Sequence, residues 1–275
     1  MSKAGIVYRH TWATRILHWI NALSVFLVLM SGLTIFNAHP RLYWGKFGAN
    51  YDRAAMVMGA ERADDGHLKG VVQMGSHMEI TTTGVLGVSS NQYGVSTVRA
   101  FPRWATIPSN YDLGAARSWH FFFAWVLVIN SAIFMTISFL KRHVQRDLWP
   151  KRGELSFKHL LHEIWDHARL KFPRGEAARN YNLLQKLTYL LVIFGLGPLL
   201  LATGLTMSPA FDAVAPWLLE LFGGRQSART IHFTCAMLII LFIFIHLLMV
   251  LLAGPFNEIR SMITGRYALP AEKTK

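Results

Sequence analysis

Four histidines of the 275-residue chain lie within or at the ends of apolar segments, where they could bind a metal cofactor. A ligating or titratable residue inside a membrane-spanning segment costs free energy, so its presence indicates a function. A lone histidine of this kind could simply hydrogen-bond to a neighbouring helix, whereas several can be tested by their spacing. The four are His18, His120, His232 and His246.

His232 and His246 are 14 residues apart in one apolar segment. At about 100° per residue, this separation returns to within roughly 40° of the starting direction, and at about 1.5 Å per residue it spans roughly 21 Å. Both side chains are therefore expected on one face of a helix, one near each surface of a bilayer.

The other two histidines supply a partner at each depth. If the last helix runs from the outside to the cytoplasm, His232 is the outer residue and His246 the inner one. His18 lies near the cytoplasmic start of the first apolar segment, and His120 near the outer start of the second. Two imidazoles on facing helices suit the axial positions of a haem iron in a helix bundle. The sequence predicts two b-type haems, the inner held by His18 and His246 and the outer by His120 and His232.

Three arginines and a glycine fit the same chemistry. An arginine precedes three of the histidines by three residues, on the same helix face and one turn nearer water, where it could bind an anionic haem propionate. These arginines could equally contact lipid phosphates. The glycine is 14 residues after His18 and could let a porphyrin approach the first helix, or allow close helix packing. The residues are Arg15, Arg117, Arg229 and Gly32.

Other residues limit the chemistry. The single cysteine, Cys235, excludes an internal disulfide, a Cys₄ iron–sulfur cluster and a C-x-x-C-H haem attachment. His159, His162 and His167 lie in an amphipathic stretch, 157–170, which favours an interfacial or solvated helix face over a metal site. None of the residues identified above is a candidate catalytic base or nucleophile for other chemistry, so substrate chemistry is expected in a partner protein.

The composition places these histidines in a membrane protein. The chain is 52% hydrophobic and 16% charged, whereas soluble domains average about a quarter charged residues. Its apolar residues form four blocks, each near the roughly 20 residues that span a bilayer. The predicted fold is an all-α four-transmembrane-helix bundle, a single domain over 1–275 with a long outer loop between its first two helices. The helices are expected at about 16–36, 119–140, 187–207 and 231–252.

Two of these helices carry further signals. The first could be a cleaved signal peptide, but residues 36–40 match a cleavage site poorly, so a retained helix is expected. The third contains Gly195, Gly197 and Pro198, which predict a kink. Residues 31–35 and 203–207 resemble each other, a weak indication of an ancient duplication.

The charges orient the chain. With a cytoplasmic N-terminus, the inner side holds eighteen basic and seven acidic residues and the outer side ten and eight, which matches the positive-inside rule. Both termini are therefore expected in the cytoplasm of a bacterium, with the chain in the inner membrane. Residues 141–186 form a cytoplasmic loop, and 37–116 a periplasmic insertion that is either a partner-docking surface or an insertion without that role. The net charge of +13 reflects these loops rather than nucleic-acid binding.

Several short motifs resemble the bacterial di-haem cytochrome b family, which includes membrane subunits of formate dehydrogenase, nickel–iron hydrogenase and thiosulfate reductase. The thiosulfate-reductase-type subunits are the most similar, although the 37–116 loop is longer than in the other two forms. The resemblance covers the four-helix core. The motifs are Arg15-Ile16-Leu17-His18-Trp19, Ser31-Gly32-Leu33, Trp119-His120, and His232 with His246.

The resemblance implies that the four histidines are axial ligands of two haems b, and that the chain has a quinone site. It also implies a periplasmic catalytic subunit, often a molybdopterin enzyme. The expected function is electron transfer between the quinone pool and this oxidoreductase partner. Two alternatives stay open: a self-sufficient quinone-linked oxidoreductase of the superoxide-oxidising type, and a transporter that uses histidine as a proton relay. A purified protein without a haem spectrum would favour the transporter.

Overall fold

Four helical stretches in the computed structural model are long and apolar enough to cross a membrane. The structure describes residues 5–49, 51–142, 144–151, 153–169 and 182–269 and is mostly helical, as predicted. Each stretch begins four to six residues before the predicted apolar block, because a helix satisfies its own backbone and can continue through polar interfacial residues. The stretches cover 12–37, 113–140, 183–206 and 225–253.

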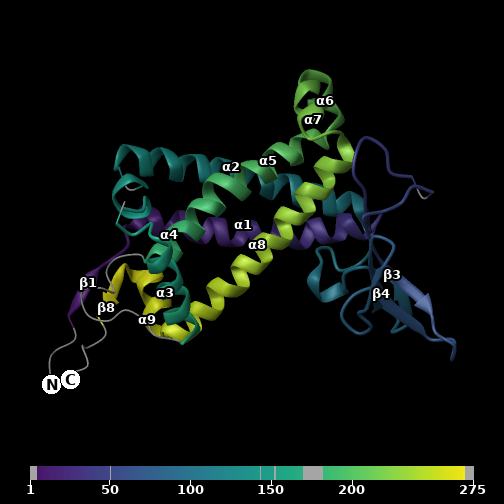
Figure 1. Ribbon diagram of the computed structural model, residues 1–275, viewed down its shortest axis with the longest axis horizontal. Coiled ribbons are helices and arrows are strands. Elements are labelled where there is room, and N and C mark those ends of the chain that lie inside the picture. Colours follow the sequence, from purple (N-terminus) through teal and green to yellow (C-terminus); the bar gives the residue numbers. More distant parts are fainter. Residues whose placement is uncertain (1–4, 50, 143, 152, 170–181, 270–275) are drawn as a thin grey trace. The chain divides into compact units, whose positions relative to one another are not determined.

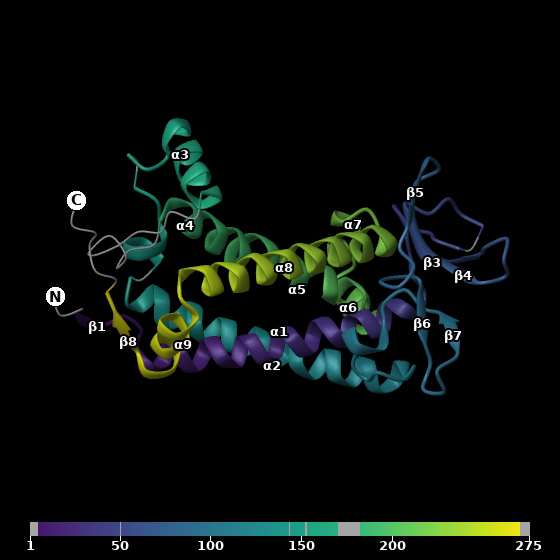
Figure 2. The ribbon, with the colours of Figure 1, turned by 90° about the horizontal axis from the view of Figure 1, so that it is seen from below.

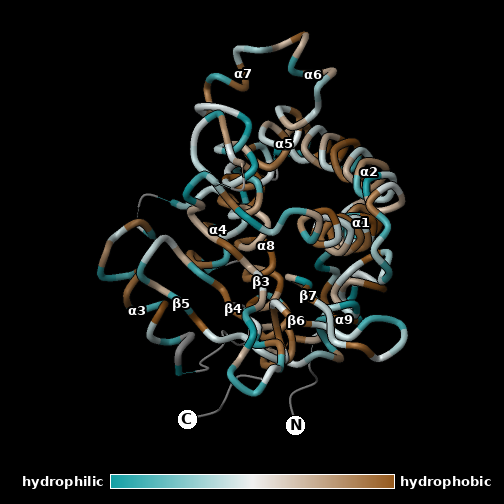
Figure 3. Tube along the Cα trace, turned by 90° about the vertical axis from the view of Figure 1, so that its right-hand side faces the viewer, coloured by the Kyte–Doolittle hydropathy of each residue, from teal (hydrophilic) through white to brown (hydrophobic). Residues whose placement is uncertain are grey.

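Three of the four stretches are continuous α-helices, and the third is not. Figure 1 labels the continuous ones, α1 (Trp12–Asn37), α2 (Leu113–Leu140) and α8 (Arg225–Ala253), and Figure 3 shows that α1 and α2 are largely hydrophobic. The third consists of α4 (Leu183–Leu190), a π-helical segment η4 (Leu191–Leu196) and α5 (Gly197–Thr206). The π-helical segment ends two residues before Pro198, whose missing N–H interrupts the α-helical hydrogen bonding. The predicted irregularity in the third span is therefore a π-helical segment.

The chain forms two compact units. The first unit contains Met1–Ile20, Asn130–Pro198 and Met237–Lys275, and the second contains Asn21–Ile129 and Leu199–Ala236. Helices α1, α2 and α8 each contribute one part to either unit.

In the first unit, the segment before the first span pairs with the segment after the last span. Strand β1 (Ile6–Tyr8) pairs antiparallel with β8 (Arg266–Ala268) (Figure 1). β1 precedes α1 and β8 follows α8, so their pairing agrees with an even number of membrane crossings between them. The unit also contains the π-helical segment η2 (Val144–Leu148), α3 (Phe157–Ala168) and α9 (Pro255–Thr264).

A buried ion pair lies at the start of the third span. The side chain of Lys186 is only 7% exposed, and its ammonium nitrogen lies 2.8 Å and 3.0 Å from the two carboxylate oxygens of Glu154. The hydrogen bond from Lys186 lowers the pKa of Glu154 below its ordinary value of 4.5. The pair therefore stabilises the fold while Glu154 is ionised.

Replacing Glu154 with glutamine is expected to lower the free energy of unfolding by about 1–3 kcal/mol at neutral pH, because it leaves a buried ammonium group without its counter-charge. The pKa of Glu154 is lowered in the folded state, so its contribution is present above the ordinary pKa and is lost as the pH falls through the lowered value. The difference in Tm from the wild type, measured in detergent, should therefore shrink as the pH falls below the ordinary pKa of 4.5. A Tm difference independent of pH would contradict this role.

In the second unit, residues between α1 and α2 form two small antiparallel sheets. One has four strands in the order β2-β3-β4-β5, and the other is the β6–β7 hairpin (Figure 2). The hairpin lies within residues 81–98, which are rich in Gly, Ser, Thr and Val. The elements are β2 (Arg41–Leu42), β3 (Met56–Arg62), β4 (Leu68–Met74), β5 (Met78–Thr81), β6 (Val88–Ser90), β7 (Ser96–Val98) and the 3₁₀-helix η1 (Arg103–Ala105). Helices α6 (Pro209–Val214) and α7 (Pro216–Leu221) connect α5 to α8.

This insertion is attached to the ends of α1 and α8. The Asn37 side chain accepts from the Phe101 N–H at 2.8 Å and donates to the Phe101 carbonyl at 3.2 Å. The Thr230 hydroxyl donates to the Tyr43 carbonyl at 2.6 Å. The ring centroid of Phe101 lies 5.8 Å from that of Phe36 on α1 and 6.3 Å from that of Phe233 on α8. The insertion is therefore a folded part of the second unit.

Candidate functional site

The first unit brings together the two histidines predicted to form the inner pair. The rings of His18 on α1 and His246 on α8 have centroids 6.4 Å apart and planes inclined at 61°. The ring of Phe242 stacks against His246 at 5.8 Å, so an apolar side chain covers one side of this imidazole.

The residues around His18 fix the start of α1. Trp19 Nε1 donates to the Met262 carbonyl at 3.1 Å, and the Arg15 guanidinium donates to the Ile263 carbonyl. Both carbonyls belong to the last turn of α9, where helix carbonyls lack partners within the helix. Arg15 Nε is buried and has no hydrogen-bond partner among the described residues. Arg15 is thus partly engaged by α9, and its predicted contact with a haem propionate remains a prediction.

The second unit brings together the other pair in almost the same geometry. The rings of His120 on α2 and His232 on α8 have centroids 6.3 Å apart and planes inclined at 60°. Both predicted pairings are therefore present as ring neighbours, each within one compact unit.

The ring separation fits two imidazoles on opposite sides of one iron atom. A metal–nitrogen distance of about 2 Å, with the ring centre about 1.1 Å further, gives centroids about 6.2 Å apart. Edge-to-face aromatic pairs also fall between about 4.5 and 7 Å, so the distance alone does not identify a ligand pair. The orientation of the rings provides the second criterion.

One turn of α1 orients the His120 ring. Its Nδ1 lies 3.0 Å from the Val28 carbonyl oxygen and 3.4 Å from Ser31 Oγ. The Ser31 hydroxyl donates to the Leu27 carbonyl at 2.6 Å. Because both neighbours of Nδ1 then act as acceptors, Nδ1 carries the proton and Nε2 keeps its lone pair for a metal ion.

One turn of α5 orients the His232 ring in the same way. Its Nδ1 lies 3.1 Å from the Leu200 carbonyl oxygen and 3.1 Å from Thr203 Oγ1. The Thr203 hydroxyl donates to the Leu199 carbonyl at 2.6 Å. His232 therefore also has Nδ1 as its protonated nitrogen and leaves Nε2 free.

A glycine follows each of these hydroxyl residues and makes room for the imidazole. A Cβ atom at Gly32 would lie 3.2 Å from His120 Cε1, and one at Gly204 would lie 3.4 Å from His232 Cε1. The structure thus places an imidazole against Gly32. The porphyrin contact predicted for Gly32 remains a prediction.

The resemblance between residues 31–35 and 203–207 contains this arrangement. In both segments a hydroxyl residue and a glycine contact the histidine, and a buried threonine follows. The sequence interpretation noted the repeat but used it only as an indication of duplication. It was the signal from which Ser31, Thr203 and Gly204 could have been identified as site residues.

Arg117 and Arg229 each contact other groups of the protein. The guanidinium carbon of Arg117 lies 5.8 Å from the centre of the Phe121 ring. Arg229 donates to the His39 carbonyl and lies 5.7 Å from the Phe36 ring centre. Burial, followed by the charges of Arg229 and Arg41, lowers the pKa of His39. Arg229 therefore helps attach the insertion to α8.

The histidines of α3 form ion-pair contacts within their own helix. His159 Nε2 lies 3.3 Å from a Glu163 carboxylate oxygen, and His162 Nε2 lies 3.2 Å from one of Asp166. The His167 side chain lies outside the described residues. In the part of the chain that the structure describes, no three His, Cys, Asp or Glu residues are placed to hold a metal ion.

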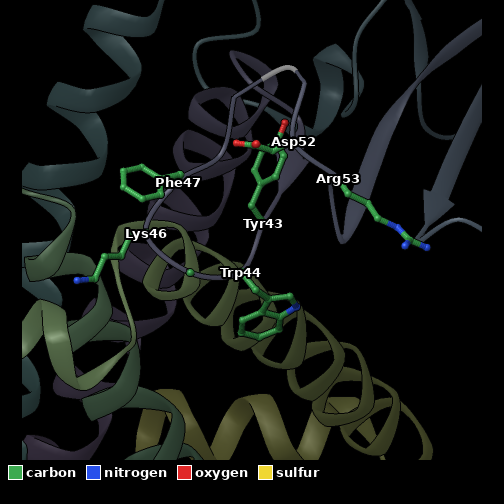
Figure 4. Close-up of a pocket in the computed structure, with 7 residues that line it drawn as sticks. Tyr43, Trp44, Lys46, Phe47, Asp52 and Arg53 are labelled. Atoms are coloured by element: carbon green, nitrogen blue, oxygen red, sulfur yellow. The ribbon is translucent and has the colours of Figure 1, made fainter.

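A shallow hollow in the insertion contains none of the predicted site residues. Its volume is about 390 Å³, and Figure 4 shows Arg53 extending away from the other lining side chains. Phe47 and Trp44 are largely exposed there. The lining residues are Tyr43, Trp44, Gly45, Lys46, Phe47, Asp52 and Arg53.

Comparison with known proteins identifies the family. The model of the prokaryotic cytochrome b561 family matches residues 9–265, a range that includes all four paired histidines. The chain belongs to the prokaryotic cytochrome b561 family. This cytochrome b561 is a multi-pass membrane protein that binds haem b and acts in electron transfer, so the predicted cytochrome b family is confirmed.

A named relative of this cytochrome b561 is "Putative protein-methionine-sulfoxide reductase subunit YedZ1" of Azospira oryzae. It is 30% identical over 153 residues, which cover 56% of this chain and 72% of the relative. No solved structure matches the cytochrome b561 chain.

Proposed function

We propose that this chain is a di-haem subunit that transfers electrons between the membrane quinone pool and an oxidoreductase partner on the periplasmic side. The observation that carries the proposal is the equal geometry of the two histidine pairs, at 6.4 Å and 61° and at 6.3 Å and 60°. A single functional pair would give no reason for the second to adopt the same separation and inclination.

In this proposal His18 and His246 hold one haem b, and His120 and His232 hold the other. A bound haem b supplies reversible one-electron transfer at its iron. Both units together then form one di-haem membrane domain over 1–275. The chain itself holds the imidazoles in place and keeps the Nε2 atoms of the outer pair unprotonated.

Several neighbours support these ligands. Ser31 and Thr203 accept from the Nδ1–H groups of the outer pair, which fixes the ring orientation and raises ligand basicity. Among the described residues, none accepts from the buried Nε–H of Arg15, and a haem propionate would satisfy this donor. Arg117 and Arg229 are proposed to act on the outer propionates.

The charge distribution supports the membrane orientation. An inner side with eighteen basic and seven acidic residues is typical of the cytoplasmic face. We therefore place β1 and β8 in the cytoplasm, the insertion in the periplasm and the chain in the bacterial inner membrane. The proposed quinone site is not assigned to residues.

The relative supports a partner enzyme. It is named as a subunit of a protein-methionine-sulfoxide reductase, whereas the motifs resemble thiosulfate-reductase-type subunits, and both names describe part of an oxidoreductase. Together with the absence of a candidate catalytic base in the sequence, this favours substrate turnover in a separate protein. A molybdopterin enzyme is the partner that the resemblance favours, and the insertion is its proposed docking surface.

The test measures haem in the full chain purified in detergent. A pyridine haemochrome assay is expected to give two haems b per chain, and duroquinol is expected to reduce both. The His39→Ala variant, which removes a histidine outside both pairs, should keep two. One haem per chain would overturn the di-haem assignment, whereas two haems that a quinol does not reduce would overturn only the quinone role.

A further inference from the structure

Helix α3 exposes a continuous apolar face. Four apolar side chains on this face are exposed to a large extent. They are Phe157 (75% exposed), Leu161 (49%), Ile164 (45%) and Trp165 (55%). At about 100° per residue they lie within an arc of roughly 100°. Figure 3 shows that hydrophobic and hydrophilic residues are mixed along this helix. An exposed apolar stripe of this size on one helix requires a covering environment.

A carboxylate on a different face of α3 binds the start of the third span. Glu163 Oε1 and Oε2 accept from the backbone N–H groups of Leu183 and Leu184, at 3.3 Å and 3.0 Å. These are the first residues of α4, where helix N–H groups lack partners and favour a negative charge. Figures 1 and 2 both show α3 beside α4.

This contact fixes the level of α3 relative to the bilayer. The third span begins at Leu183, so α3 lies where a membrane-crossing helix leaves the hydrocarbon layer. The helix that carries the apolar stripe therefore lies beside the start of a stretch long and apolar enough to cross a membrane. This position favours lipid as the environment that covers the stripe.

Two cationic residues lie beside the apolar stripe, Lys158 within α3 and Arg169 just after the end of the helix at Ala168. Lys158 directly follows Phe157 in the sequence, so its side chain is rotated by about 100° about the helix axis from that of Phe157. The Arg169 guanidinium lies over the Trp165 ring, 4.4 Å from its centre. Tryptophan and basic side chains with apolar stems are typical of the interface between acyl chains and headgroups.

A hollow on this side of α3 combines the two kinds of residue. Its volume is about 810 Å³, and its lining includes Lys158 together with the apolar residues Leu161 and Trp165. The remaining lining residues are Ser156, His159 and His162. A phospholipid has two parts that match these residues. Its phosphate can bind a cation, and its acyl chains can contact apolar side chains.

We propose that α3 lies in the headgroup layer of the leaflet in which the third span begins, and that the hollow beside Lys158 and Trp165 binds an anionic phospholipid. This inference does not depend on haem or on the partner enzyme. It goes beyond the proposed electron transfer because it gives the chain a lipid-binding site.

The first experiment measures the depth of α3 in lipid nanodiscs. Cys235→Ser removes the native thiol, and a nitroxide is then attached at Leu161→Cys or at Asp166→Cys on the other face. The nitroxide at position 161 is expected to collide more often with oxygen than with a water-soluble nickel chelate. The nitroxide at position 166 is expected to collide more often with the nickel chelate than with oxygen. Leu238→Cys, on an exposed part of α8, serves as the lipid reference. Equal, water-like exposure of both labels to the chelate would overturn the proposal.

The second experiment tests the headgroup. Native mass spectrometry counts phosphatidylglycerol molecules retained by the full chain, with phosphatidylcholine as the neutral comparison. Lys158→Gln is expected to weaken phosphatidylglycerol retention about fivefold without changing that of phosphatidylcholine. Lys69→Gln on β4 is the matched control and should change neither. Unchanged phosphatidylglycerol retention in Lys158→Gln would overturn the anionic site, and the far-UV circular dichroism of each variant checks that it is folded.

Discussion

Replacing His120 with alanine is expected to reduce the haem content of the purified protein from two per chain to one. His120 and His232 share one compact unit, and His18 and His246 share the other. Loss of one imidazole from a bis-histidine site removes one of its two protein–iron bonds, while the other pair keeps both. His232→Ala should give the same single haem, and so should the double variant of both residues.

The pairing itself is tested by combining variants across the units. His120→Ala with His232→Ala removes two ligands of the same site, so one haem should remain. His18→Ala with His120→Ala removes one ligand from each site, so neither pair is left complete and both haems should be lost. The pyridine haemochrome assay distinguishes these results directly. A full haem complement in the His18→Ala/His120→Ala protein would show that the four histidines are paired wrongly or do not bind haem.

Replacing Gly204 or Gly32 with leucine is expected to remove the outer haem while every histidine stays in place. A Cβ atom alone would already lie 3.4 Å or 3.2 Å from the imidazole of His232 or His120, and the rest of a leucine side chain would occupy the position of the ring. Metal sites tolerate ligand displacements of only about 0.5 Å, so haem content should fall from two to one.

A graded series makes this result specific. Alanine at position 32 requires the His120 ring to move by a few tenths of an ångström, whereas alanine at position 204 makes an ordinary contact with His232. Each alanine variant should therefore retain more outer haem than the matching leucine variant. Gly114→Leu on α2 is the matched control, because Gly114 is exposed and a Cβ atom there would meet only Asp112 Oδ1, at 3.5 Å. Haem content equal to that of the wild type in both leucine variants would show that the glycines do not shape the site.

Much of the histidine arrangement could be predicted because it depends on regular geometry. Hydropathy defines the spans, and the helical repeat places His232 and His246 on one face. With an alternating chain direction, the depth of each remaining histidine follows. The predicted helix bounds were too short at the N-terminal ends, where polar residues such as Arg15 and Arg229 lower the hydropathy but do not end a helix.

The hydrogen bonds to the outer imidazoles could not be predicted in the same way. Whether the Ser31 hydroxyl reaches His120 depends on the rotation of two helices about their own axes, which sequence spacing does not determine. The contact of Glu163 with the start of α4 depends on the packing of α3, a helix separated from α4 along the chain. The sheets of the insertion depend on pairing between short strands, whose registers are set by non-local contacts.

The pairing of β1 with β8 has a consequence for biosynthesis. At about 5–20 residues per second, Ile6 leaves the ribosome roughly 15–50 s before its partner Ala268, and His18 waits almost as long for His246. The pair of His18 and His246 therefore has only one of its two histidines while the rest of the chain is translated and inserted. In the proposed pairing, this site gains its second histidine only near the end of synthesis, after the site of His120 and His232 already has both.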